Sequence, residues 1–298
     1  MKSIKESDSK KHHYLPRFYL KGFIDSRNEF YVFDKLKEEI RKSKPDNSFY
    51  EKYRNTAFGK DKVGKTNILE DMYAQYDSRA SSVFREVRNS KLNDPVLTPY
   101  NLAILRLFII NLFWRIPSHD KLLDLLIDTN SFKDLGFQFI NKSTGKPIEK
   151  NAEDDLKQIE AWRKMYRVIV PHLSSRKEFQ KTNYENWKLM YRPQEYNITG
   201  DNPIMLYSFE DFSSLNEELL FPISKNILLC NTKKKIPPTL PPKFNVLTDL
   251  LILLNSKRFV CCVDKSYLDL VVNKFYSEAK GKNFRRYILD SIFDYFES

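Results

Sequence analysis

Residues 99–116 read PYNLAILRLFIINLFWRI and contain the longest apolar run of the chain. Thr98 followed by Pro99 is a pattern typical of a helix start, with a hydroxyl at the N-cap and proline in the first turn. From Leu102 to Trp114, apolar side chains then occupy nearly every side of the helix, interrupted only by Arg106 and Asn111. A helix that is apolar all round is buried, and this run is shorter than the roughly 20 residues that a membrane span needs. We therefore expect residues 99–116 to form the central core helix.

Further helices are predicted on both sides of this segment. Upstream, apolar residues recur every three or four positions from Thr66 to about Ser90. Downstream, residues 120–140 and 156–173 show helical spacing, and the polar residues 141–155 between them read as a loop. Three more helical or aromatic segments are predicted in the C-terminal third, at residues 245–256, 266–279 and 287–296.

Short aromatic and β-branched runs predict strands. They lie at residues 30–34, 187–191, 196–199, 204–207, 227–230 and 259–263. This order predicts an α+β fold, in which a helical middle segment packs on a mainly antiparallel sheet formed by the N-terminal strand and the C-terminal half. We expect a flexible basic tail at residues 1–11 and one domain over 12–298, with a possible lobe boundary near 174–183.

Composition favours an anionic partner. The formal net charge is +11, from 50 lysines and arginines against 39 aspartates and glutamates. Surface cations attract phosphate groups, which makes nucleic acid the expected partner, although a basic surface also serves solubility. Only seven glycines are present, which leaves little material for a glycine-rich phosphate loop. The three cysteines fit reduced, buried thiols, and no apolar leader is visible, so we expect a cytoplasmic protein that binds no membrane.

The N-terminal segment HHYLPRFYLKGF, residues 12–23, concentrates groups that could do chemistry. It holds two of the four histidines of the chain, His12 and His13, together with Arg17. A histidine can act as a general base or bind a metal near neutral pH, and an arginine can hold a phosphate. The alternative reading is that His13 only caps a helix.

Carboxylates elsewhere in the chain could complete a site with His13. Glu70 lies in the predicted helix 66–90, and Asp201 with Asn202 lies in the turn Thr199-Gly200-Asp201-Asn202-Pro203 between two apolar strands. Asp201 and Glu70 would give an oxygen-rich site suited to magnesium or manganese. The competing reading is structural, with Glu70 on a solvated helix face and Asp201 in an Asx turn.

Arg115 and Asn111 are four residues apart and share a face of the central helix. Arg115 is also the last helical residue before Ile116-Pro117, where a cation interacts favourably with the helix dipole. Two interpretations remain open: an arginine that caps the dipole, or an arginine that binds a phosphate in a cleft with Asn111 beside it.

The chain resembles the bacterial family of proteins of unknown function numbered 4238 (DUF4238). The resemblance covers nearly the whole chain and rests on segments that occur in matching order: 13–23, 31–35, Arg115-Ile116-Pro117, 199–203, 221–224 and Leu254-Asn255. Two positions depart from the pattern: Gly200, and Asp77, which stands where the family usually has glutamate. The second departure weakens any acid role for Asp77. The resemblance implies an accessory protein of bacterial mobile or defence regions.

These observations lead to three hypotheses. The first is an enzyme that cleaves RNA or DNA phosphodiesters, in phage defence or as a toxin, with His13, Asp201 and Glu70 as catalytic residues. Its phosphate-binding residues would be Arg17, Arg115, Asn111, Asn202 and His12. The second is a non-enzymatic module that binds nucleic acid or a protein, in which the polar motifs pin the N-terminal segment onto the sheet. The third is transfer or hydrolysis on a nucleotide.

Overall fold

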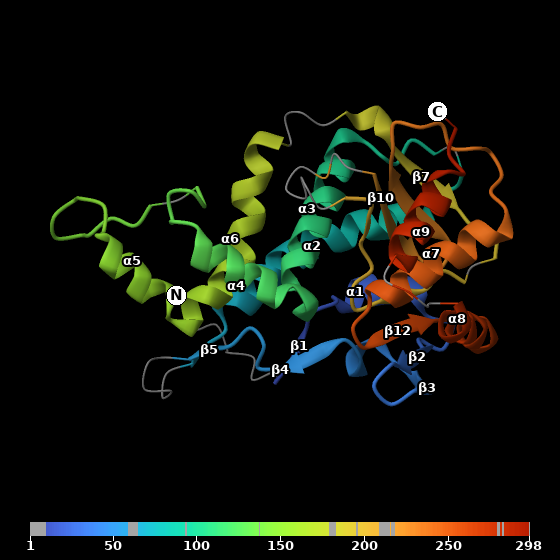
Figure 1. The fold of residues 1–298 in the computed structure, drawn as a ribbon, viewed down its shortest axis with the longest axis horizontal. Coiled ribbons are helices and arrows are strands. Elements are labelled where there is room, and N and C mark those ends of the chain that lie inside the picture. Colours follow the sequence, from blue (N-terminus) through green and yellow to red (C-terminus); the bar gives the residue numbers. More distant parts are fainter. Residues whose placement is uncertain are drawn as a thin grey trace.

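The computed structural model describes residues 10–58, 65–92, 94–136, 138–178, 183–194, 196–208, 215, 218–278, 281 and 283–297. Most of the predicted tail, residues 1–9, and part of the predicted lobe boundary, residues 179–182, therefore lie outside the described residues. The predicted α+β fold is confirmed: a helical middle segment packs against antiparallel sheets built from both ends of the chain (Figure 1).

Helix α3 (Pro99–Arg115) is the centre of the helical part, as the sequence predicts. It packs between α2 (Ile68–Asn89) and α6 (Glu160–Glu178), and twelve of its residues are buried. The Thr98 hydroxyl accepts a hydrogen bond from the Asn101 N–H at 3.2 Å, which confirms the predicted N-cap. Burial of an apolar surface on nearly all sides is what fixes this helix inside the fold.

The segment that follows α3 differs from the prediction. Helix α4 (Asp120–Thr129) ends about ten residues before the predicted boundary, where the Asn130 amide donates to the Leu126 carbonyl and closes the last turn. Helix α5 (Lys150–Lys157) begins inside the stretch expected to be a loop. It carries Leu156 against the core, a single apolar contact that gives too weak a periodic signal to predict.

No single helix in the described part of the chain is long and apolar enough to cross a membrane. Helix α3 and the segment Pro117–Thr129, which are bent by 65° relative to each other, meet the length and composition criteria only as a pair.

One four-stranded antiparallel sheet joins the two ends of the chain. Its strand order is β3 (Glu39–Ser43), β2 (Phe30–Asp34), β12 (Phe259–Cys262) and β8 (Thr199–Gly200). The N-terminal strand therefore pairs with the C-terminal half, as predicted: Phe33 lies opposite Val260.

A second four-stranded antiparallel sheet corrects the expectation of a single sheet. Its order is β7 (Trp187–Tyr191), β11 (Ile227–Asn231), β10 (Leu219–Ser224) and β9 (Met205–Leu206). Strand β10 was not predicted, because all six of its residues are buried and its run LLFPIS has no alternation and contains Pro222. The pairing register with β11 shifts between Pro222 and Ser224, which accommodates the missing proline N–H.

Three helices complete the C-terminal part: α7 (Pro242–Asn255), α8 (Lys265–Glu278) and α9 (Phe284–Phe293). Their apolar faces form one core cluster with β12 and β11, and the larger cluster around α3 draws on residues from Tyr14 to Cys261. The three cysteines are free and buried in β11 and β12, in agreement with the prediction.

The N-terminal segment lies along this framework. Strand β1 (Lys11–His13) pairs with β4 (Tyr50–Lys52) and continues through Pro16 into α1 (Arg17–Leu20) and a 3-10 turn (Lys21–Phe23) (Figure 1). A second short ribbon pairs β5 (Ala57–Phe58) with β6 (Lys65–Thr66). The guanidinium of Arg88 on α2 holds the segment by donating to the carbonyls of Phe18 and Tyr19, each at 2.9 Å.

Candidate functional site

A surface cleft of about 810 Å³ opens beside β1 and α1. Four of the predicted site residues line it: His13, Arg17, Glu70 and Arg115. The sequence therefore predicted correctly that the N-terminal motif and the end of the central helix face the same space. The cleft is also lined by Lys11, Lys21, Tyr73, Asp77 and the turn Pro45-Asp46.

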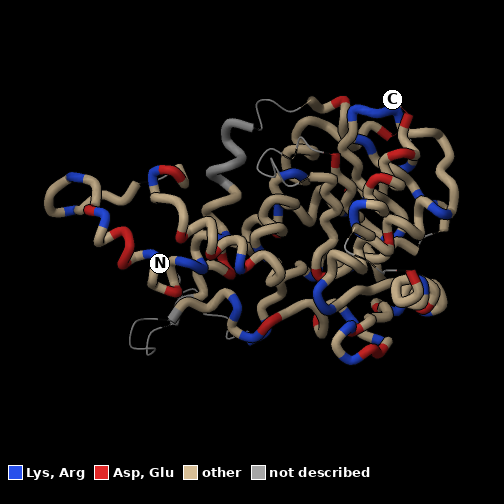
Figure 2. Tube along the Cα trace, in the orientation of Figure 1, with Lys and Arg blue, Asp and Glu red and all other residues tan. Residues whose placement is uncertain are grey.

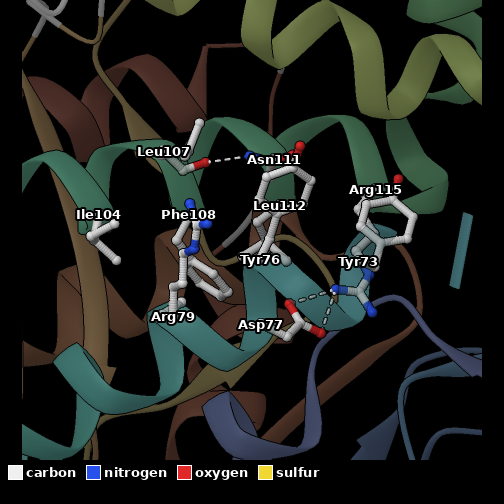
Figure 3. A pocket seen from close by; sticks show the side chains of 11 residues that line it. Tyr73, Tyr76, Asp77, Arg79, Ile104, Leu107, Phe108, Asn111, Leu112 and Arg115 are labelled. Atoms are coloured by element: carbon white, nitrogen blue, oxygen red, sulfur yellow. Dashed lines mark hydrogen bonds and ion pairs between the residues drawn. The ribbon is translucent and has the colours of Figure 1, made fainter. Parts of the chain in front are cut away.

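Arg115 is held by protein groups at the inner wall of the cleft. Its Nη1 donates to both carboxylate oxygens of Asp77, at 3.0 and 2.9 Å, and its Nη2 donates to the His13 carbonyl at 2.7 Å. The guanidinium also lies 4.4 Å from the centre of the Tyr73 ring, and Figure 3 shows Asp77 and Arg115 facing each other between α2 and α3. Burial raises the pKa of Asp77, and the neighbouring Arg115 opposes that shift. Arg115 thus ties β1 to both helices, and a phosphate would have to share it with Asp77.

His13 lies half-buried at the cleft with a defined tautomer. Its Nε2 is 3.1 Å from the Pro45 carbonyl, which can only accept, so Nε2 carries the proton and the lone pair lies on Nδ1. Burial lowers the pKa of His13 to about 4, with further lowering by Arg17 and Arg115, while the Pro45 carbonyl opposes the shift. The imidazole is therefore neutral at pH 7, with one nitrogen able to accept a proton.

His12 points to the opposite face of β1 and is only 1% exposed. Its Nδ1 accepts the backbone N–H of Asn55 at 2.9 Å, and Glu70 Oε1 lies 3.3 Å from the same nitrogen. A nitrogen that accepts from Asn55 cannot also donate to Glu70, so His12 Nδ1 has a structural role as the acceptor of the Asn55 N–H. Glu70 itself accepts a hydrogen bond from the Asn55 side chain. The buried position corrects the phosphate contact predicted for His12.

Asp201 does not line the cleft and is 6% exposed. Its carboxylate accepts the backbone N–H groups of three consecutive residues, Lys257 at 2.8 Å, Arg258 at 2.7 Å and Phe259 at 2.9 Å. Burial raises the pKa of Asp201, and these three donors oppose the shift. Asp201 therefore fixes the chain leading into β12, which corrects its predicted role as a partner of His13.

Gly200 departs from the expected family pattern for a steric reason. A Cβ atom at this position would lie 2.1 Å from the Ser256 hydroxyl and 2.9 Å from Val260 Cγ1. Only glycine lets the turn before Asp201 approach β12 this closely.

Asn202 and Asn111 lie in two further places. The Asn202 amide is 3.3 Å from His119 Nε2, and His119 Nδ1 is 2.8 Å from the Phe113 carbonyl, so Nδ1 donates and Nε2 accepts. The Asn111 amide donates to the Leu107 carbonyl at 2.8 Å, inside a small cavity of about 20 Å³ between α2 and α3 (Figure 3). Asn111 does share a helix face with Arg115, as predicted, yet neither asparagine lines the large cleft.

The magnesium or manganese site predicted from Asp201 and Glu70 is not assembled. Glu70 lies at the cleft, whereas the Asp201 carboxylate accepts a backbone N–H at the start of β12. Within the described ranges, no three side chains of His, Cys, Asp or Glu are placed to hold a metal ion.

The predicted site leaves out several residues that line the cleft, chiefly Lys11, Lys21 and Asp46, and it gives Asp77 only a weakened role. Two of them carry a signal that alternation rules could have found. Lys11 and His13 are two apart on a strand, and Arg17 and Lys21 are four apart on a helical turn, so each pair shares a face. Asp46, which accepts a hydrogen bond from the Arg17 guanidinium at 2.8 Å, lies in a turn with no such periodicity.

A family comparison matches residues 11–261 of the 298 to the description "Protein of unknown function (DUF4238)". Comparisons with curated proteins and with solved structures find no match. The matched range includes β1, the cleft, α3, the Asp201 turn and all but the last residue of β12. The chain therefore belongs to the DUF4238 family.

Proposed function

We propose that this protein binds nucleic acid, with the phosphate backbone lying in the cleft beside β1 and α1. The observation that supports this most directly is the placement of Lys11, Arg17 and Lys21, three exposed cations on one wall of the cleft. Exposed cations that line one cleft are suited to bind a run of phosphates.

Three acidic residues of the described chain line the cleft: Asp77 and Asp46 are paired with arginines, and Glu70 accepts a hydrogen bond from the Asn55 side chain. Asp77 is neutralised by Arg115, with which it shares two short contacts. Asp46 pairs with Arg17 where both side chains are more than half exposed, and such a surface pair contributes little free energy. A phosphate can therefore replace Asp46 as the partner of Arg17. Figure 2 shows cations and acids interspersed along the coloured part of the chain. The basic wall therefore comes from the positions of these three side chains in the fold and not from a run of basic residues in the sequence.

The first prediction tests this wall. The triple variant Lys11→Ala/Arg17→Ala/Lys21→Ala should bind a single-stranded oligonucleotide about tenfold or more weakly at low salt. Its affinity should also depend less on salt, by about two units of slope, because three phosphate contacts are lost. Fluorescence anisotropy against salt concentration measures both quantities.

A matched control removes the same charge elsewhere. Lys37, Lys121 and Lys243 are exposed and line no part of the cleft. If their triple alanine variant loses as much affinity as the cleft variant, the cleft is not the binding site.

Phosphodiester hydrolysis is a second candidate, supported by His13. Its neutral imidazole lies at the cleft with the proton fixed on Nε2, so Nδ1 could take a proton from an attacking hydroxyl. A pKa near 4 makes this nitrogen a weak base, which is why we place binding first. By family resemblance we propose a bacterial, cytoplasmic setting in phage defence or as a toxin.

The second prediction separates hydrolysis from binding alone. If His13 is a base, cleavage of RNA or DNA should rise as pH increases through about 4 and level off by neutral pH, because the lowered pKa leaves His13 deprotonated there. The variant His13→Gln keeps a donor for Pro45 but cannot accept the proton, so cleavage should fall about a hundredfold or more. Rates measured with and without divalent ions test this, and an unimpaired His13→Gln enzyme would rule out the role.

A further inference from the structure

A second hollow, of about 330 Å³, is lined by Tyr50 and Lys52 of β4, whereas Lys11 and His13 of the paired strand β1 line the cleft. Three cations line it, Arg41, Lys52 and Arg258, and none of its lining residues is a carboxylate. Of these three cations, Arg258 forms an ion pair with Asp34 at 3.0 Å. Arg41 and Lys52 are exposed, and neither forms an ion pair with any residue that the structure describes. This hollow is a more purely basic surface than the cleft itself.

The two spaces share a wall. In the turn Pro45–Asn47, Pro45 and Asp46 line the cleft, whereas Asn47 lines the hollow. The Asn47 side chain accepts a hydrogen bond from Lys11 Nζ at 3.0 Å, and Lys11 lines the cleft. A ligand that leaves the cleft at Lys11 therefore reaches the hollow directly.

The ribbon carries basic groups across this wall. Lys11 lies opposite Lys52, and His13 lies opposite Tyr50, so these four side chains share one face of the two strands. Residues directly opposite in an antiparallel pair have Cα atoms about 5 Å apart, and like charges in that position are destabilising. An anion lying over Lys11 and Lys52 would relieve that repulsion.

We infer that the ligand is a single strand of several nucleotides, whose backbone runs from the cleft over Lys11 and Lys52 into a second phosphate site made by Arg41, Lys52 and Arg258. The inference rests on the proposed function and extends it from one phosphate site to a continuous path. The size of the cleft and hollow supports a single strand, because volumes of 300–1,000 Å³ hold small ligands and cannot admit a double helix. The path crosses the ribbon at Tyr50, whose ring has Lys11 Nζ 4.8 Å from its centre.

The experiment compares short and long strands on two variants of the full chain. Fluorescein-labelled RNA and DNA of about three and about twelve nucleotides cover one site or both. The test variant is Arg41→Gln/Lys52→Gln. The control is Lys37→Gln/Lys42→Gln, which removes the same amount of charge outside the hollow. Lys42 is next to Arg41 on β3, but its side chain points to the opposite face and pairs with Glu29 at 3.2 Å. Melting temperatures confirm that both variants fold.

The wild-type protein should bind the long strand about tenfold or more tightly than the short one, and the test variant should lose most of that advantage. Its salt dependence for the long strand should fall by about 1.4 units of slope, for two lost phosphate contacts. The control should keep the advantage. A wild type without any length advantage, or a test variant that matches the control, overturns the second site while leaving the cleft proposal standing.

Two other outcomes are distinct. A wild type that binds neither strand overturns the proposed function together with this inference. A blunt duplex that binds as tightly as the single strand overturns the single-strand assignment.

Discussion

Single residues in this protein have structural roles that their sequence context does not reveal. The Asp201 turn was predicted correctly as a rigid turn between strands, but its carboxylate points inward to three amides of residues 257–259. His12 and His13 are neighbours in sequence and lie on opposite faces of one strand. Strand alternation separates such neighbours, and the segments that pack over each face decide which of the two meets solvent.

The third prediction concerns Asp201. The variant Asp201→Asn keeps the shape of the side chain but removes one of its two acceptor oxygens and the charge, so at least one buried N–H loses its partner. We expect the free energy of unfolding to fall by about 2–4 kcal/mol. Urea unfolding measures the loss, and Asp46→Asn, on an exposed pair, should change it by less than about 1 kcal/mol. A stability loss no larger than that of the control would contradict the structural role.

Elements of the fold are connected by a small number of polar contacts around the N-terminal segment. Arg115 joins α3 to α2 through Asp77 and to β1 through the His13 carbonyl. Arg88 joins α2 to α1, and it also donates to the Ile223 carbonyl of β10 at 3.2 Å. The sequence position of Arg115 suggested either a helix-capping or a phosphate-binding arginine, and neither interpretation included these contacts. Its partner Asp77 lies 38 residues upstream in another helix, so the local sequence does not indicate the pair.

The fourth prediction measures this connection with a double-mutant cycle. Asp77→Ala should lower the free energy of unfolding by about 3–5 kcal/mol, because it leaves the buried guanidinium of Arg115 without its carboxylate. The double variant Asp77→Ala/Arg115→Ala should lose less than the sum of the single losses, by roughly 1–3 kcal/mol. Urea unfolding of the four proteins provides the cycle. Losses that add within about 0.5 kcal/mol would mean that the two residues act independently.

At the scale of the whole molecule, the strongly patterned segments and the α+β arrangement were predictable, and the division into two four-stranded sheets was not. Helices α2 and α3 and strand β2 follow from periodicity and from the Thr98–Pro99 start signal. Strand β10 was missed because a fully buried strand shows no alternation and Pro222 argues against a central position. Without β10 the second sheet could not be recognised. The sequence also does not show that Asp201 lies outside the cleft shared by His13, Arg17, Glu70 and Arg115, because that depends on their positions in the folded chain.

The N-terminal segment forms some of its hydrogen bonds with residues about 180 to 200 positions further along the chain. The Tyr19 hydroxyl lies 2.7 Å from the Thr199 hydroxyl, 180 residues further along the chain, and the Gly22 carbonyl accepts the N–H of Lys225 at 2.8 Å. During translation, these two contacts cannot form until Thr199 and Lys225 have emerged from the ribosome, and at roughly 5–20 residues per second this delay is on the order of ten seconds or more. A chain that is still being synthesised therefore lacks these two contacts of the segment that carries Arg17 and Lys21.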